Sequence, residues 1–377
     1  MFDPSDSTPT NVIERRKAEH MRLAANSDVA GQQGPGWSDI HLLHDALPKC
    51  DLARIDLAVD FLGRQLQAPL LIAGMTGGHE AAREVNKLLA RAAEYFGIAM
   101  GVGSQRAALI QPDLADTYAI ARQQAPNAFL IANLGAAQLV DQDSTPRLTG
   151  TDLQRAVDMI QADALAIHLN FLEELIQTEG DRRVAGLGDA LTDAIRSLTV
   201  PALAKETGVG ISRETAVELA RVGFSGLDVG GYGGTSFAAV EALRAQSAGD
   251  DRGVRMGEVF AHWGLPTPVA VVAVSTSSLP IVATGGVRSG LDAAKAIALG
   301  GTLVGVARPL LLAALAGEDS LFAWIRQFLE ELRAAVFLTG GARISDLRLV
   351  KRVILGDTRT WLQDLGYLDA AEVAAAG

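Results

Sequence analysis

The sequence predicts an α/β fold in the form of a (β/α)8 TIM barrel. Short aliphatic runs alternate with amphipathic helical stretches, and nearly every run ends in small or polar residues. Apolar strands bounded by helical patterns indicate parallel βαβ units. Eight such strands predict a barrel. A doubly wound open sheet is the structural alternative; the strand count disfavours it, and no Gly-x-Gly-x-x-Gly motif follows the first strand.

The predicted strands and helices alternate through most of the chain. The strands are expected at Pro69–Met75, Ile98–Gly103, Phe129–Leu134, Ala164–His168, Val200–Ala204, Gly226–Val229, Pro280–Ala283 and Leu303–Val306. Helices are expected between them, for example at Glu80–Phe96, Leu153–Ala162, Arg213–Val222 and Gly290–Leu299. Residues 320–365 supply the last helices, and the apolar stripe over residues 321–337 indicates plain packing.

The amino-terminal end is expected to differ from the barrel. Residues 1–11 are polar and lack an apolar core, so we expect a disordered end and no signal peptide. Residues 12–26 predict a helix rich in basic side chains, and residues 31–36 predict a loop. The predicted organisation is a disordered end followed by a single barrel domain over residues 12–377, which begins with the basic helix.

Composition excludes several classes of protein. The chain has 377 residues and a net charge of −11, which argues against a nucleic-acid partner. An anionic substrate therefore needs a local cluster of basic groups. One cysteine, Cys50, excludes an internal disulfide and a multi-cysteine metal site. The apolar run at 296–317 is interrupted by Arg308-Pro309, so we expect a helix end, a strand and another helix, no membrane anchor, and a cytoplasmic protein.

The turn at residues 230–236 predicts a cofactor site. It follows an apolar strand, contains four glycines, and ends in Thr235-Ser236 before a predicted helix at 237–244. Glycines let the backbone approach a ligand closely. A Ser or Thr cap leaves N–H groups that attract anions. An ordinary strand-to-helix turn is the alternative, but four glycines are more than such a turn needs.

Other strand ends suit a phosphate and a flat ring. Residues 285–290 and 305–309 follow the last two strands, where barrels often bind phosphate through backbone N–H groups. Residues 75–78 end the first strand without a charge, which suits a wall against a ring. Lys205 follows apolar neighbours, and a buried lysine is costly unless paired. It is expected to face an electron-rich ring edge; a surface lysine is the alternative.

A third group of strand ends carries acid, amide and imidazole side chains. His168 and Asn170 lie on the same side of an extended segment, and Glu173 and Glu174 follow. A carboxylate beside phosphate-binding cations holds Mg²⁺ most simply, although acidic residues are also common at a solvated helix start. Basic residues at 16, 17 and 20 share one helical face and predict an anion clamp; an exposed basic face is the alternative. None of the Cys-x-x-Cys, His-Glu-x-x-His, P-loop or Gly-x-Ser-x-Gly motifs is present.

Taken together, these motifs resemble the type 2, FMN-dependent isopentenyl diphosphate isomerase family. The resemblance runs from about residue 12 to residue 367. It is carried by residues 16–20, 68–78, 101–106, 132–135, 168–170, 205–212, 228–236, 263–267 and 284–290. It implies a (β/α)8 barrel that assembles as a homotetramer or octamer.

The resemblance also implies site residues. FMN is expected to bind at Met75, Thr76, Gly77, Ser104, Asn133, Lys205, Ser212, Thr235, Gly286, Arg288, Ala307 and Arg308. The substrate diphosphate is expected to meet Arg16, Lys17, His20, Ser104, Arg106, His168 and Asn170. Mg²⁺ is expected at Glu174, and Glu173, His168 and Asn170 are the expected catalytic residues.

The family reaction moves a double bond in a five-carbon prenyl diphosphate. A proton adds to the terminal alkene carbon, and another leaves the neighbouring carbon. The flavin must be reduced, usually by NADPH, although no net electrons are transferred. A reduced, anionic flavin stabilises a nearby carbocation, and its N5 is suited to carry a proton.

One position departs from the family pattern. The family reads His-Leu-Asn-Pro-Leu-Gln-Glu, whereas this chain has Phe171 for the proline and Glu173 for the glutamine that faces the alkene. Unlike an amide, a carboxyl group can act as a general acid. One hypothesis is an ordinary isomerase in which Glu173 replaces the glutamine as proton relay. The other is a diverged relative that protonates a different or longer prenyl substrate and starts a cyclisation.

Two further functions, a flavin barrel without isomerase activity and a 2-hydroxy-acid oxidase, fit the residues less well. A flavin barrel for electron transfer or regulation would not need Arg106, His168, Asn170 and Glu174, which serve the substrate in the family. A 2-hydroxy-acid oxidase would carry a histidine base and paired arginines, which are not found at the expected strand ends.

Overall fold

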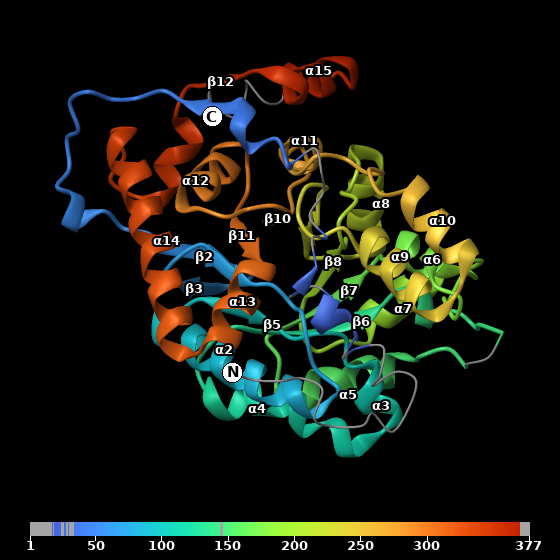
Figure 1. Ribbon diagram of the computed structural model, residues 1–377. Helices are drawn as coiled ribbons and strands as arrows, with labels where there is room; N and C mark the ends of the chain where they lie inside the picture. The colour runs from blue at the N-terminus through green and yellow to red at the C-terminus, as the bar shows by residue number, and fades with distance from the viewer. Residues whose placement is uncertain are drawn as a thin grey trace.

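The predicted barrel is confirmed. The computed structural model describes residues 17, 19–23, 26–27, 29, 34–143 and 146–369. Within them, eight parallel strands close in the order β10-β11-β4-β5-β6-β7-β8-β9, with helices around them (Figure 1). The barrel strands are β4 (Leu70–Ile72), β5 (Ala99–Gly101), β6 (Leu130–Gly135), β7 (Ala164–His168), β8 (Ala202–Lys205), β9 (Gly226–Asp228), β10 (Ile281–Thr284) and β11 (Leu303–Val306).

The outer helices occupy the stretches between the strands. Two of them, α2 (Glu80–Phe96) and α8 (Arg213–Val222), have the predicted bounds. Each ends at a glycine in the left-handed region, Gly97 with φ 60° and Gly223 with φ 112°, as a helix stop of this type requires. The other helices are α3 (Arg106–Ile110), α4 (Asp116–Gln124), α5 (Gly150–Ile160), α6 (Phe171–Ile176), α7 (Leu187–Arg196), α9 (Phe237–Ala248), α10 (Asp251–Val259), α11 (Thr267–Val274), α12 (Gly290–Ala298), α13 (Arg308–Ala316), α14 (Glu318–Leu338) and α15 (Gly356–Asp364).

The apolar run at residues 296–317 forms a helix end, a strand and another helix, as predicted. It contains the end of α12, all of β11 and all of α13. Gly300 and Gly301 separate the first two elements, and Arg308 with Pro309 begins the third. Among the described residues, no helix combines the length and the apolar character that a membrane crossing requires.

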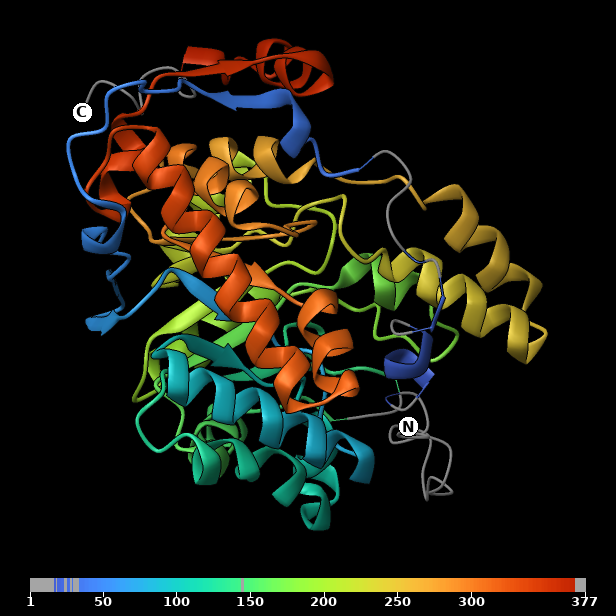
Figure 2. The same ribbon diagram turned by 60° about the vertical axis from the view of Figure 1, so that its left-hand side comes forward.

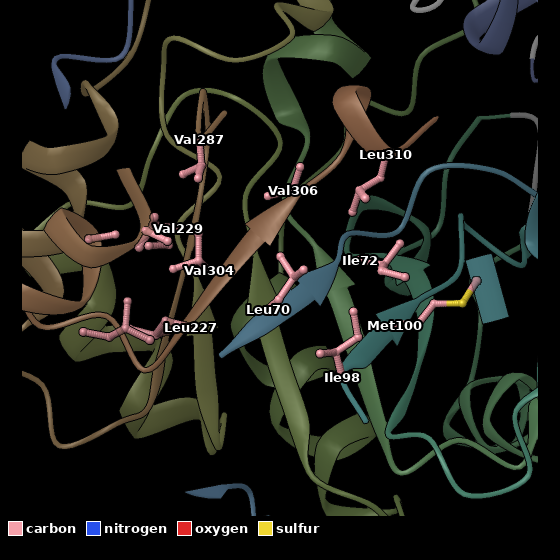
Figure 3. Packing of buried hydrophobic residues seen from close by; sticks show 14 of the residues in the cluster. Leu70, Ile72, Ile98, Met100, Leu227, Val229, Val287, Val304, Val306 and Leu310 are labelled. Atoms are coloured by element: carbon pink, nitrogen blue, oxygen red, sulfur yellow. The ribbon is translucent and has the colours of Figure 1, made fainter. Parts of the chain in front are cut away.

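Alternation along the strands builds two apolar layers. Leu70 and Ile72 of β4 and Met100 of β5 belong to the large cluster that also contains helix residues, so they face the surrounding helices (Figure 3). Leu71, between them, belongs to a second cluster with inward residues of the other strands, such as Leu203. This period of two is what a strand buried on both faces predicts.

Two small antiparallel sheets escaped the sequence analysis. The hairpin of β2 (Val59–Phe61) and β3 (Arg64–Leu66) contributes Phe61 to the inner cluster, where its ring meets Phe129 edge to face at 5.6 Å. Because Phe129 precedes β6, the hairpin covers the amino-terminal end of the barrel. The second sheet pairs β1 (Ile40–Leu42) with β12 (Arg352–Ile354).

The described part of the amino-terminal segment, residues 17, 19–23, 26–27 and 29, lies beside α9, at the end of the barrel opposite the β2–β3 hairpin (Figure 2). Residues 17, 19–23 and 26 of the predicted basic helix are helical. Ser236 N–H donates to the Val29 carbonyl at 2.8 Å, and Arg308 Nη2 donates to the Ser27 carbonyl at 3.0 Å. The segment therefore covers the carboxyl ends of the strands. Residues 1–11 and Arg16 lie outside the described residues.

Truncating Leu70 should destabilise the barrel. Its side chain is fully buried, so Leu70→Ala should lower the free energy of unfolding by about 2–5 kcal/mol, through lost burial and the cavity left behind. Leu291→Ala is the matched control, because Leu291 is 48% exposed, and it should cost less than about 1 kcal/mol. Denaturant unfolding measures both values, and equal losses would contradict the packing described.

Candidate active site

A cavity of about 780 Å³ lies at the carboxyl ends of the barrel strands. This is the size of a small-molecule or cofactor site. It brings together almost all of the residues that the sequence singled out. They are Lys17, His20, Met75, Thr76, Gly77, Ser104, Arg106, Asn133, His168, Asn170, Glu173, Glu174, Lys205, Thr235, Gly286, Arg288, Ala307 and Arg308.

Two expected residues are not in this set. Ser212 is the N-cap of α8, where its Oγ accepts the Thr215 N–H at 3.2 Å, and it does not line the cavity. That bond satisfies a helix end without any ligand. Arg16 lies outside the described residues, so its place relative to the cavity stays a prediction. Its neighbour Lys17 does line the cavity.

The glycine loops pack against each other at one wall of the cavity. A Cβ on Gly234 would lie 2.9 Å from the Gly286 backbone nitrogen. Gly286 itself has φ 64°, and a Cβ there would lie 2.6 Å from the Gly233 carbonyl oxygen. Side chains are therefore excluded, and backbone groups line this wall together with Thr235 and Arg288. Such a wall fits a phosphate group, as the sequence predicted.

Lys205 sits at the end of β8 on the cavity wall. Its Nζ donates to the Glu206 carbonyl at 2.8 Å. Burial raises the pKa of Asp228, and the nearby Lys205 charge opposes that rise. The Lys205 side chain therefore lies among buried strand ends, with part of it open to the cavity. This placement fits the expected contact with an electron-rich ring edge.

Glu206 is a buried carboxyl group of the cavity wall whose importance the sequence analysis missed. Burial raises its pKa to about 8, although the Val209 and Thr207 N–H groups and Lys205 oppose the rise. The Glu173 charge adds to the increase. Glu206 is therefore mostly protonated at pH 7. The sequence did contain a signal for Glu206. It directly follows Lys205 and lies in residues 205–212, which carry the family resemblance.

His168 is held in one orientation by Asn133. The Asn133 amide nitrogen donates to the Val102 carbonyl at 3.0 Å, so its Oδ1 is free to accept from His168 Nδ1 at 2.8 Å. The hydrogen of the imidazole therefore lies on Nδ1. The bond fixes the ring at the carboxyl end of β7, where His168 lines the cavity.

Arg106 and Glu174 belong to one buried polar network. Arg106 Nη1 pairs with Asp181 Oδ2 at 2.7 Å, and the Asp181 N–H donates to Glu174 Oε2 at 2.7 Å. Gln138 Nε2 donates to Asp181 Oδ2 at 2.9 Å. Asp181 and Gln138 were not expected here. Asp181 follows Glu174 closely in the chain, which was the only hint that it shares the site.

A second network surrounds Glu241, a buried residue of α9. His20 Nε2 lies 2.5 Å from Glu241 Oε1, and Arg244 Nη1 lies 2.7 Å from Oε2. Burial alone would raise the pKa of Glu241, but His20 and Arg244 lower it, so it is a carboxylate. Gln177 Nε2 donates to Glu241 Oε1 at 3.0 Å and to Glu173 Oε1 at 2.9 Å. The expected residues His20 and Glu173 are thereby joined.

Lys17 closes the cavity from the amino-terminal segment. Its Nζ donates to the Ser104 carbonyl and to the Tyr118 hydroxyl, and the Tyr118 hydroxyl donates to the Ser104 carbonyl at 2.6 Å. Burial raises the pKa of Tyr118, so the phenol stays neutral. Lys17 and His20 line the cavity of the chain that carries them. Lys17 therefore adds positive charge to this site.

Comparison with known proteins finds a matching family model and several similar enzymes. A model of the FMN-dependent dehydrogenase family matches residues 11–139 and 208–352. The isopentenyl-diphosphate delta-isomerase of Methanosarcina barkeri is 46% identical over 369 residues, covering 97% of this chain and 99% of that protein. The enzyme of the same name from Methanoregula boonei is 46% identical over 351 residues, covering 93% and 96%. That of Halobacterium salinarum is 44% identical over 360 residues, covering 95% and 97%.

Solved structures share the fold at much lower identity. A mandelate oxidase variant with a monooxide FMN adduct superposes with a TM-score of 0.59 at 17% identity, covering 88% of this chain and 95% of that one. A variant with (S)-mandelic acid gives 0.58 at 18%, covering 91% and 96%. These likenesses show the barrel fold alone.

The raised pKa of Glu206 predicts a pH dependence of stability. In the folded protein this carboxyl keeps its proton up to about pH 8, whereas an ordinary glutamate loses it near 4.5. The stabilising contribution is therefore complete below pH 4.5 and is lost as the pH rises towards 8. Over this pH range the ionisation of Glu206 should lower the free energy of unfolding by up to about 1.4 kcal/mol per pH unit.

Glu206→Gln keeps a neutral side chain at every pH. The free energy of unfolding, measured from pH 5 to pH 8, should fall less steeply in Glu206→Gln than in the unmodified chain. Parallel pH profiles would show that Glu206 ionises normally in the folded protein.

Proposed function

The chain belongs to the type 2, FMN-dependent family of isopentenyl-diphosphate delta-isomerases, and we propose that it converts isopentenyl diphosphate into dimethylallyl diphosphate with FMN bound in the barrel cavity. One observation carries this proposal. The cavity holds the glycine loops and Lys205 on the cofactor side and Arg106, His168 and Asn170 on the substrate side. A barrel that only bound flavin would have no use for the second set.

The residues present fit FMN. The wall at Gly234 and Gly286 leaves no room for side chains, and Lys205 lies beyond it on the same cavity. We infer that the glycine loops, Arg288 and Arg308 hold the phosphate and that Lys205 faces the ring. When bound and reduced, FMN supplies negative charge that stabilises positive charge developing on the substrate.

The chain's own residues bind and orient the substrate. Arg106 and Lys17 carry the positive charge that a diphosphate needs in an acidic protein. His168, held by Asn133, presents its imidazole in one orientation. The amino-terminal segment covers the cavity and limits the access of water. Low water content matters because a carbocation is otherwise captured by solvent.

Glu173 is the residue proposed to move the proton. Its Oε2 accepts from Asn170 Nδ2 at 3.1 Å and its Oε1 accepts from Gln177 Nε2 at 2.9 Å, and it lines the cavity. A carboxyl held in this way can give and take a proton where the family glutamine cannot. The alternative, proton-initiated chemistry on another or longer prenyl substrate, rests on the same substitution.

The metal ion, the reductant, the assembly and the location of this protein are proposals that rest on the family resemblance. Mg²⁺ is proposed at Glu174, a buried carboxylate of the cavity wall whose Oε1 lies 3.4 Å from Asn170 Nδ2. One carboxylate shared with a diphosphate is a common form of Mg²⁺ site. NADPH is proposed as the reductant, a homotetramer or octamer as the assembly, and the cytoplasm as the location.

The isomerase reaction predicts deuterium incorporation. Purified protein with FMN, NADPH, Mg²⁺ and isopentenyl diphosphate in D₂O should form dimethylallyl diphosphate that carries deuterium, because the added proton comes from exchangeable groups. Omitting the reductant under anaerobic conditions should abolish the product. Mass spectrometry of the product measures both results.

The variant Glu173→Gln separates the two hypotheses for this position. Retained five-carbon isomerisation within about tenfold supports an ordinary isomerase that tolerates the change. If the unmodified chain gives no labelled product although its FMN is reduced normally, the isomerase proposal fails. A different product from a longer prenyl diphosphate, lost in Glu173→Gln, would then establish the alternative.

A further inference from the structure

His20, Glu173 and Glu241 bring three metal-ligating side chains together, and the first two of them line the cavity. They come from the amino-terminal segment, the start of α6 and the middle of α9. One ligand atom from each lies within 4.8 Å of the other two. Ligands about 2.1 Å from one ion at tetrahedral angles lie roughly 3.4 Å apart, so small side-chain movements would close the set around an ion.

Hydrogen bonds around the cluster already orient both carboxylates. Gln177 Nε2 donates to Oε1 of Glu173 at 2.9 Å and to Oε1 of Glu241 at 3.0 Å. Arg244 Nη1 donates to the other Glu241 oxygen at 2.7 Å. Metal ligands are commonly held by a surrounding shell of this kind, which fixes their orientation before the ion arrives.

An unpartnered oxygen lies against the same cluster. Asn170 is 6% exposed, and its Nδ2 donates to Glu173 Oε2 at 3.1 Å. Its Oδ1 is buried and has no hydrogen-bond partner within the described ranges. A buried amide oxygen without a donor is costly. Asn170 also lines the cavity, so rotation of its amide towards Glu173 would bring this oxygen to an ion held by the cluster as a further ligand.

We propose that His20, Glu173 and Glu241, with Asn170 Oδ1, bind a divalent first-row transition ion such as Zn²⁺. The imidazole nitrogen separates this site from the Mg²⁺ position proposed at Glu174, because Mg²⁺ selects oxygen ligands and imidazole suits Zn²⁺ and its neighbours. The site depends on Glu173, which stands where the family pattern has a neutral glutamine. An ion bound there would occupy the carboxyl group proposed as the proton relay, so the site lies outside the isomerase reaction.

The test is a calorimetric titration of the FMN-loaded protein with ZnCl₂ in millimolar Mg²⁺, which occupies sites made of carboxylates alone. The unmodified chain should bind one Zn²⁺ per chain. Glu173→Gln and His20→Gln should each weaken that binding at least tenfold. The titration requires no turnover, so its result is independent of the isomerase assay.

Two matched variants control for charge. Glu174→Gln removes a neighbouring carboxylate of the same charge, and Glu218→Gln removes an exposed one on α8; both should bind Zn²⁺ within about twofold of the unmodified chain. The proposal is overturned if Glu173→Gln binds Zn²⁺ as tightly as the unmodified chain. It is also overturned if Glu174→Gln weakens binding as much as Glu173→Gln, because general electrostatics would then explain the effect.

Discussion

Closing eight parallel strands into a barrel brings the carboxyl end of every strand to the same rim. Residues far apart in the chain, such as Thr76, His168, Lys205 and Arg308, therefore line one cavity. The other end is covered by the β2–β3 hairpin with Phe61. Because one end is filled by apolar side chains, ligand chemistry is confined to the rim where the glycine loops leave the strands.

The cavity combines side chains of opposite charge. Lys17, Arg106 and Lys205 supply positive charge where a phosphate or ring edge is expected, although the chain as a whole is acidic. Glu173 lines the cavity and is joined through Gln177 to the buried Glu241. Cationic groups expected to bind an anionic substrate therefore share one cavity with the carboxyl groups proposed to move a proton and to hold Mg²⁺. The covering amino-terminal segment contributes Lys17 and His20 to this cavity.

Much of this arrangement could be predicted from the sequence, because the strands are continuous apolar runs and their ends carry recognisable motifs. The strand boundaries shifted where chemistry required it: β8 extends to Lys205, and β4 stops at Ile72 so that the following residues can line the cavity. Glu241, Gln177 and Asp181 escaped detection. Each lies alone on a helix or loop, and only the folded chain brings it to the site. The β1–β12 sheet escaped because its short strands are about 300 residues apart.

One cavity is proposed to bind reduced flavin and a prenyl diphosphate side by side. The absorption spectrum of the reduced, FMN-loaded protein tests it directly during anaerobic titration with isopentenyl diphosphate. A saturable change in the flavin spectrum is predicted, because the substrate would lie against the ring in a site shielded from water. A spectrum that stays unchanged at saturating substrate would contradict the account and would favour a flavin barrel that binds no prenyl diphosphate.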